Sequence, residues 1–174
     1  MQKGDNNNKI IKKIITAALL AALTFVGTMI IQIPTGTNGY IHVGDGIIYL
    51  AACILPWQYA MVVGAGGALL ADCLTGFAIW APGSVVIKAL TALLFTSKGK
   101  KMMSLHNWIA LIPAALVCAG GYYLYESLIY GNFVASLAGI PLSLTQSAIS
   151  SLLFVIIGLS VDKTNYKSKL TGGL

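Results

Sequence analysis

The sequence predicts an all-α integral membrane protein, a bundle of six transmembrane helices with both termini in the cytoplasm. Hydrophobic residues make up 57% of the chain and charged residues only 9%, whereas a soluble domain carries about 25% charged residues. Apolar segments alternate with short polar turns, and lysines gather in segments that would face one side of a bilayer. The length predicts a single integral membrane domain, residues 1–174.

The lysine distribution sets the predicted topology. The chain contains no arginine, and all but one of its lysines fall into three clusters. These clusters are Lys3, Lys9, Lys12 and Lys13, then Lys98, Lys100 and Lys101, then Lys163, Lys167 and Lys169. Because cytoplasmic loops attract lysine, all three should lie on one side. Residues 1–9 and 162–174 are then cytoplasmic tails, and residues 10–161 hold the six helices.

Six apolar segments are expected to form these helices. They cover Ile10–Gln32, Gly44–Leu55, Tyr59–Leu74, Gly83–Thr96, Trp108–Leu128 and Leu142–Val161. The second and fourth are short for a spanning helix, which needs about 20 residues. The tryptophans Trp57, Trp80 and Trp108 fall at segment ends, as is typical of an interfacial aromatic belt. The first segment is too long for a signal-peptide core, so we expect it to be retained.

Ionisable residues within the apolar segments indicate a polar site, because charges are costly inside a bilayer. Asp72 and Lys88 are expected at similar depth on antiparallel neighbouring helices. An ion pair between them is the economical interpretation, and such a pair serves the structure, a ligand or both.

Two further polar groups accompany that pair. Tyr40, His42 and Asp45 lie among glycines where the first outer loop meets the second helix, and Tyr122 and Glu126 lie near the outer end of the fifth. Loop-edge polar residues are often only solvated, and tyrosines often belong to the interfacial belt. All three groups nevertheless fall toward the outer face. This asymmetry favours an outward-facing pocket over a channel or proton relay, which needs polar groups at successive depths.

Several classes of function are excluded or disfavoured. The motifs H-E-x-x-H, G-x-S-x-G and the P-loop are missing from the sequence, so we expect no catalytic residues and no enzyme. His42 and His106 fall on opposite predicted sides, so a metal site is not expected. The lysines form no basic stripe interleaved with aromatic residues, so nucleic acid is not an expected partner.

Small residues in two helices indicate close helix packing, because backbones approach where side chains are small. In the third helix the glycines Gly64, Gly66 and Gly67 are interpreted as internal packing. In the first helix Ala17, Ala18, Ala21 and Ala22 form two small-xxx-small pairs. Those alanines fit internal packing and an outward seam for another protein equally well.

Three motifs resemble a known family. They read G-Y-I-H-V-G-D-G from Gly39, G-A-G-G-A-L-L-A-D from Gly64, and G-F-A-I-W-A-P-G from Gly76, followed by V-I-K ending at Lys88. This pattern resembles the substrate-binding subunits (S components) of energy-coupling-factor (ECF) vitamin transporters. It is most similar to the riboflavin-type branch that includes hydroxymethylpyrimidine and pyridoxine carriers.

The resemblance implies a multi-pass subunit in a prokaryotic plasma membrane that binds one vitamin or precursor near its outer face. A transmembrane coupling subunit and two ATPase subunits would act with it, so ATP would be consumed by partners and this chain would carry no cofactor. The four alanines resemble the A-x-x-x-A motif by which such subunits dock on the coupling subunit.

Eight residues are expected to bind the substrate. They are Asn38, Tyr40, His42, Asp45, Trp80, Lys88, Tyr122 and Glu126. Asp72 and Lys88 are expected to frame the site, and the turn from His42 to Asp45 to cover it. Hydroxymethylpyrimidine or pyridoxine is the favoured substrate and riboflavin the next. The alternatives are a stand-alone, homo-oligomeric secondary transporter of a small polar solute, and an assembly protein without a ligand.

Overall fold

The computed structural model describes residues 2–34, 40–164 and 167–168, with side chains from residue 6 onward. Within these residues the chain forms six α-helices, two 3-10 helices and one two-stranded ribbon. The α-helices are α1 (Gln2–Ile30), α2 (Gly44–Ile54), α3 (Trp57–Leu74), α4 (Ala81–Leu93), α5 (Leu105–Tyr130) and α6 (Gly139–Lys163). The shorter elements are β1 (Ile33–Pro34), β2 (Tyr40–Ile41), η1 (Ala78–Trp80) and η2 (Ala135–Ala138).

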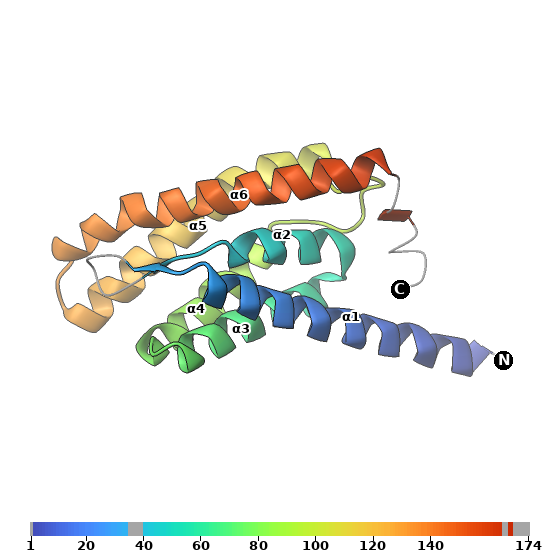
Figure 1. Ribbon diagram of the computed structural model, residues 1–174, viewed down its shortest axis with the longest axis horizontal. Coiled ribbons are helices and arrows are strands. Elements are labelled where there is room, and N and C mark those ends of the chain that lie inside the picture. The colour runs from blue at the N-terminus through green and yellow to red at the C-terminus, as the bar shows by residue number, and fades with distance from the viewer. Residues whose placement is uncertain (1, 35–39, 165–166, 169–174) are drawn as a thin grey trace.

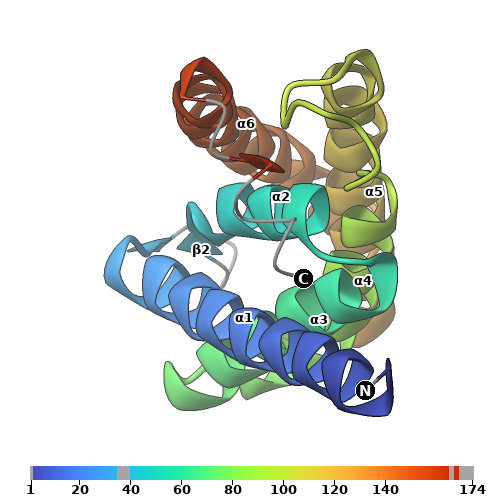
Figure 2. The same ribbon diagram turned by 90° about the vertical axis from the view of Figure 1, so that its right-hand side faces the viewer.

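The helices surround α2, as Figures 1 and 2 show from two directions. Helices α5 and α6 run side by side along one flank, and α1, α3 and α4 pack together along the other. Helix α2 lies between these flanks, in contact with α1, α3 and α6. The start of α1 and the end of α6 lie at the same end of the bundle (Figure 1).

The prediction of a mostly helical chain is confirmed, and each predicted apolar segment coincides with one helix. The largest difference is at the start, where α1 begins at Gln2 and runs through most of the predicted N-terminal tail. No glycine or proline interrupts the stretch from Asp5 to Lys13, and its lysines favour a helix. Helix α1 is therefore about 43 Å long, which exceeds the ~30 Å hydrocarbon core of a bilayer.

Three helical stretches of the described chain are long and apolar enough to cross a membrane. They are Asn6–Ile30, Leu105–Tyr130 and Ala135–Lys163. The stretches Gly44–Ile54 and Ala78–Leu93 are apolar but shorter. The chain is thus a membrane protein whose long helices α1, α5 and α6 lie around shorter ones.

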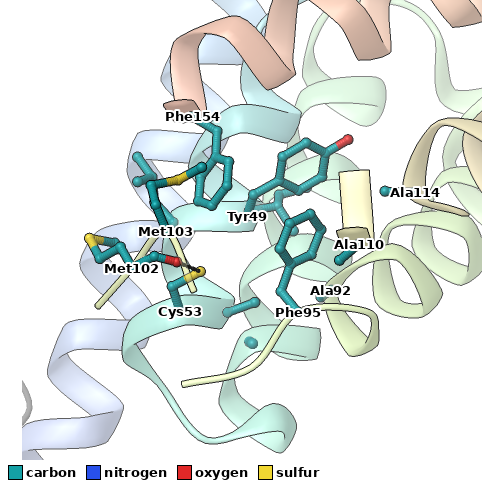
Figure 3. Close-up of a cluster of buried hydrophobic side chains, with 13 residues drawn as sticks. Tyr49, Cys53, Ala92, Phe95, Met102, Met103, Ala110, Ala114 and Phe154 are labelled. Atoms are coloured by element: carbon teal, nitrogen blue, oxygen red, sulfur yellow. Dashed lines mark hydrogen bonds between the residues drawn. The ribbon is translucent and has the colours of Figure 1, made fainter. Parts of the chain in front are cut away.

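Helix α2 is the centre of the core, since nine of its eleven residues are buried. Its Tyr49 ring stacks on Phe95 at 4.5 Å between centroids and meets Phe154 edge-on at 5.9 Å. Figure 3 shows these rings converging from α2, the segment after α4, and α6, with Met102 and Met103 beside them. This cluster joins the two flanks through α2.

Glycines bring α3 close to its neighbours, as the sequence predicted. A Cβ atom at Gly64 would lie 2.9 Å from the Lys88 carbonyl oxygen of α4. One at Gly67 would lie 2.7 Å from the Thr24 side chain of α1. Larger residues at either position would push these helices apart.

A network of hydrogen bonds, here called the loop network, closes the end of the bundle that holds the Lys98–Lys101 loop. The fully buried Asn107 side chain accepts from the Thr96 amide (2.9 Å) and donates to the carbonyls of Thr96 (3.0 Å) and Met102 (2.8 Å). Asp162 of α6 accepts from the amides of Met102 (2.7 Å) and Met103 (2.9 Å). These bonds fasten the loop between α4 and α5 onto the end of α6.

Candidate functional site

A pocket opens at the other end of the bundle, between β2, α3, η1, α4, α5 and α6. About 540 Å³ of space free of protein atoms lies within its lining, a figure that includes solvent at the open mouth. Five of the eight predicted substrate-binding residues line it: Tyr40, His42, Trp80, Tyr122 and Glu126. Asn38 lies outside the described residues. Asp45 and Lys88 are each only 1% exposed and lie beneath the lining residues.

One wall of the pocket carries a carboxylate with a spare oxygen. The Tyr40 hydroxyl donates to Asp72 Oδ1 at 2.6 Å, and burial, followed by the nearby Asp72 charge, raises the pKa of Tyr40, so the hydroxyl keeps its proton. Asp72 Oδ2 is buried and has no partner within hydrogen-bond distance and angle in the described part of the chain, although the Ser84 hydroxyl lies near this carboxylate. Leaving a buried acceptor unpaired costs about 1–3 kcal/mol. A donor on a bound ligand would remove this cost.

The predicted ion pair between Asp72 and Lys88 is wrong, because Lys88 pairs with Asp45 instead. Lys88 Nζ lies 2.8 Å from Asp45 Oδ1 and 2.9 Å from Oδ2. Similar depth on adjacent helices did not decide the pairing, because the backbone of Lys88, not its side chain, faces Gly64 of α3. The side chain instead reaches α2 and lies 3.7 Å from the Cys118 sulfur of α5.

Two lining residues separate this ion pair from the pocket. Gln146 of α6 donates from Nε2 to Asp45 Oδ2 at 3.0 Å. The ring of Tyr122 lies over Lys88, with Nζ 4.9 Å from its centroid, and its hydroxyl lies 3.0 Å from the Ser84 hydroxyl. Asp45 therefore belongs to the floor of the site and not, as predicted, to a turn that covers it.

His42 sits at the edge of the pocket as a neutral ring. Its Nδ1 accepts from the Gly44 amide at 3.1 Å, and its backbone carbonyl accepts from the Ser150 hydroxyl at 3.4 Å. Burial lowers the pKa of His42 to about 4. Its ring lies 5.5 Å from that of Tyr40, which in turn packs on Phe77 at 4.6 Å.

Aromatic rings and a second carboxylate complete the lining. Trp80 is buried, and its ring centroid lies 6.2 Å from that of Tyr122. The Glu126 carboxylate lies against Gly139, where an added Cβ would be 2.6 Å from Oε2. Flat aromatic surfaces beside carboxylate oxygens suit the binding of a small ring that carries hydrogen-bond donors.

Sequence reasoning missed the contribution of α6. Gly139, Ser143 and Gln146 of this helix line the pocket. They are spaced four and three residues apart, so they share one helical face, and the buried polar residues Ser147 and Ser150 extend that face. A polar stripe at helical period in an otherwise apolar segment is the signal that could have identified them. Asp72 and Ser84 also line the pocket without having been predicted as ligand contacts.

The four alanines of α1 divide into two pairs with different surroundings. Ala17 is buried against Val63 and Leu55, and Ala21 is half-buried with its carbonyl close to Gly67. Ala18 and Ala22 are exposed on the adjoining face of the helix, about 100° around its axis. Internal packing therefore accounts for Ala17 and Ala21 only.

Metal ligands do not gather in the described part of the chain. No group of three or more histidine, cysteine, aspartate or glutamate side chains there is placed to hold a metal ion. The polar groups that do gather lie around the Lys88–Asp45 pair and the pocket, where hydrogen bonds and one ion pair join most of them.

Comparison with known proteins gives two findings that agree. The family described as "ECF-type riboflavin transporter, S component" matches residues 8–163, nearly the whole chain. A curated relative, the thiamine precursor transporter HmpT of Lactococcus lactis subsp. cremoris, is 26% identical over 160 residues, which cover 91% of this chain and 92% of the relative.

These findings decide between the alternatives that the sequence left open. They favour a transporter subunit over an assembly protein without a ligand, and a component of an ECF system over a stand-alone secondary transporter. Family and relative are both transport proteins and not enzymes. The chain belongs to the ECF-type riboflavin transporter S component family, whose members are the vitamin-uptake subunits that its motifs resemble.

Proposed function

We propose that this subunit binds hydroxymethylpyrimidine, a precursor of thiamine, in the pocket between β2, α3, α5 and α6. The observation that carries the proposal is the unpartnered Asp72 Oδ2 within an aromatic-lined pocket. Hydroxymethylpyrimidine is a single flat ring with an amino group and a hydroxymethyl group, so it offers several donors to such acceptors. The relative HmpT, named as a thiamine precursor transporter, supports the same substrate.

Other vitamins fit the pocket less well. Pyridoxine is also a single ring with several hydroxyl donors, and we place it second. Riboflavin has three fused rings, and the polar edge of its ring system consists mainly of acceptors. That edge would face the acceptors Asp72 and Glu126, so a preference for riboflavin is not expected.

The roles proposed for the predicted residues follow from their positions. Trp80 and Tyr122 would contact the ring, and Asp72 and Glu126 would accept from its donors. Tyr40 and His42 would line the mouth of the pocket, and the role of Asn38 stays a prediction from the sequence. Asp45 and Lys88 would act below the ligand as the frame of the site.

Ligand binding to the purified subunit tests the proposal. Quenching of tryptophan fluorescence should report nanomolar binding of hydroxymethylpyrimidine, weaker binding of pyridoxine, and the weakest binding of riboflavin and thiamine. Trp80→Phe should abolish most of the quenching, whereas Trp57→Phe, at the exposed start of α3, should keep it. Failure of all four compounds to bind would contradict the proposed function.

We further propose the single-domain arrangement and topology that the lysines predict, with six spans, both termini in the cytoplasm and the pocket facing outward. The Lys98–Lys101 loop, the start of α1 and the end of α6 share one end of the bundle, which supports an even number of crossings (Figure 1). A cysteine introduced at Lys100, in a variant with Cys73→Ser, should react with a membrane-impermeant reagent only from the cytoplasmic side. Reaction from the outside of intact cells would overturn this topology.

The partners proposed are a transmembrane coupling subunit and two ATPase subunits, which would use the ATP. We place the docking seam at Ala18 and Ala22, because these two of the four alanines face away from the bundle. Replacing both by leucine should leave substrate affinity unchanged and abolish co-purification with the coupling subunit. The same change at Ala17 and Ala21 should instead destabilise the bundle. Unaltered co-purification of the Ala18/Ala22 variant would show that the seam lies elsewhere.

A further inference from the structure

The Lys88–Asp45 ion pair lies outside the pocket lining but is hydrogen-bonded to one of the lining residues. Asp45 is 1% exposed and does not line the pocket. Gln146, which does line it and is 4% exposed, directs its Nε2 at Asp45 Oδ2 (3.0 Å) and lies 3.9 Å from the Cys118 sulfur through the same atom. One side-chain amide therefore carries the hydrogen bond between the ion pair and the pocket lining.

An amide side chain has one donor end and one acceptor end, and the hydrogen-bond network decides which way it points. Asp45 has both oxygens within 3 Å of Lys88 Nζ, and a carboxylate accepts hydrogen bonds without donating any. Gln146 must therefore turn its NH2 group toward Asp45. Its Oε1 is left for the pocket, and no donor within the described residues reaches that oxygen.

We infer that Asp45, held by Lys88, is a positioning residue for substrate specificity: it fixes Gln146 with its carbonyl oxygen toward the ligand. This inference rests on the proposed function, since it assumes that the pocket binds the substrate. Asp72, Glu126 and Gln146 come from three helices and line one pocket, so Gln146 Oε1 would add a third acceptor to the two carboxylates. The site then selects rings with amino or hydroxyl donors and rejects isosteric rings that present acceptors there.

Replacing Asp45 by asparagine should change the group that Gln146 presents to the pocket from a hydrogen-bond acceptor to a donor. In Asp45→Asn, Lys88 donates to the oxygen of the introduced asparagine, and the NH2 group of that asparagine then faces Gln146. Gln146 must then turn to accept, and its own NH2 group faces the pocket. A role in stability alone would weaken the binding of every ligand alike and would not change their order.

The test compares hydroxymethylpyrimidine with two analogues, one with the amino group replaced by an oxo group and one with the hydroxymethyl group replaced by a formyl group. The formyl analogue replaces one donor by an acceptor, and the oxo analogue does the same at the amino position while its neighbouring ring nitrogen gains a hydrogen. The wild-type subunit should bind hydroxymethylpyrimidine about tenfold or more tightly than at least one analogue. That ratio should fall toward one, or reverse, in Asp45→Asn and in the charge-neutral double variant Asp45→Asn/Lys88→Gln. An unchanged ratio in folded Asp45 variants would overturn the inference.

Gln146→Met provides a second test that leaves the ion pair intact, and it decides the matter if neither Asp45 variant folds. It should also remove the preference, whereas the same change at the exposed Gln58 should preserve it. Retention of the preference in Gln146→Met would overturn the inference.

Asp162→Asn, the matched aspartate change in the loop network, should lower stability without altering the ratio. Wild-type protein that binds none of the three compounds contradicts the proposed function, whereas normal binding with unaltered ratios contradicts only the role of Asp45.

Discussion

The two ends of this bundle both contain buried polar groups, and they differ in whether those groups are satisfied. In the loop network, Asn107 and Asp162 find partners for their side chains in the backbone of the loop. In the pocket, Asp72 Oδ2 lacks a partner within the described chain. An unpaired buried acceptor is costly, and Asp72 lines the pocket, unlike the unpaired Tyr49 hydroxyl of the core, so its free oxygen supports a ligand there, whereas a satisfied network indicates structure. We therefore assign ligand binding to the end that holds the pocket, and a structural role to the end that holds the loop network.

Removing one member of the buried ion pair should have the largest effect. Lys88→Met leaves the Asp45 carboxylate without its counter-charge, and such a change costs about 3–5 kcal/mol. The double variant Lys88→Met/Asp45→Asn should recover most of that stability, because no unpaired charge remains. Thermal unfolding in detergent measures both. A single variant as stable as the wild type would mean that the pair is not part of the frame.

Removing the centre of the loop network should cost somewhat less. Asn107→Ala leaves the Thr96 amide and carbonyl without the Asn107 side chain and the Met102 carbonyl with only the Cys53 thiol, and we expect a loss of about 2–4 kcal/mol. Substrate affinity of the folded fraction should stay at the wild-type value, because Asn107 is far from the pocket. A large loss of affinity in the folded protein would contradict the assignment of a purely structural role to the loop network.

Acidification should destabilise the pocket end through His42. Since burial lowers its pKa to about 4 from an ordinary value near 6.5, the folded state binds fewer protons than the unfolded state between these values. Stability is therefore complete above pH 6.5 and falls by roughly 1 kcal/mol per pH unit below it, toward pH 4. His42→Asn keeps an acceptor for the Gly44 amide and should flatten this part of the profile. Equal slopes for wild type and variant would contradict the assignment.

The smallest expected change in stability, with a clear change in binding, comes from Asp72→Asn. This isosteric change removes the negative charge of Asp72. The remaining oxygen can still accept from Tyr40, and an NH2 donor replaces the other oxygen. Stability should change by less than about 1 kcal/mol, and affinity for hydroxymethylpyrimidine should fall about tenfold. Titration of both proteins measures the difference. Wild-type affinity would show that the free oxygen of Asp72 does not meet the ligand.

Much of the fold could be predicted because its causes are local. The apolar runs and the turns between them placed the helices, and Gly64 and Gly67 predicted close packing around α3. The collection of Tyr40, His42, Trp80, Tyr122 and Glu126 at one end followed from their depth along the helices. The contribution of Gln146 was not predicted, because the polar stripe of α6 indicates one helical face but not the residues that this face meets.

The sequence by itself determined that this chain is a helical membrane protein with costly charges that had to be compensated. It also carried the motifs by which the chain belongs to its family. Only the tertiary structure decided which charges compensate each other, because that depends on the rotation of each helix about its axis. Lys88 faces α2 and not α3, so it pairs with Asp45 and leaves Asp72 to the pocket. The depth of a residue along its helix can be counted from the sequence. The direction in which its side chain points is set by the packing of all six helices together.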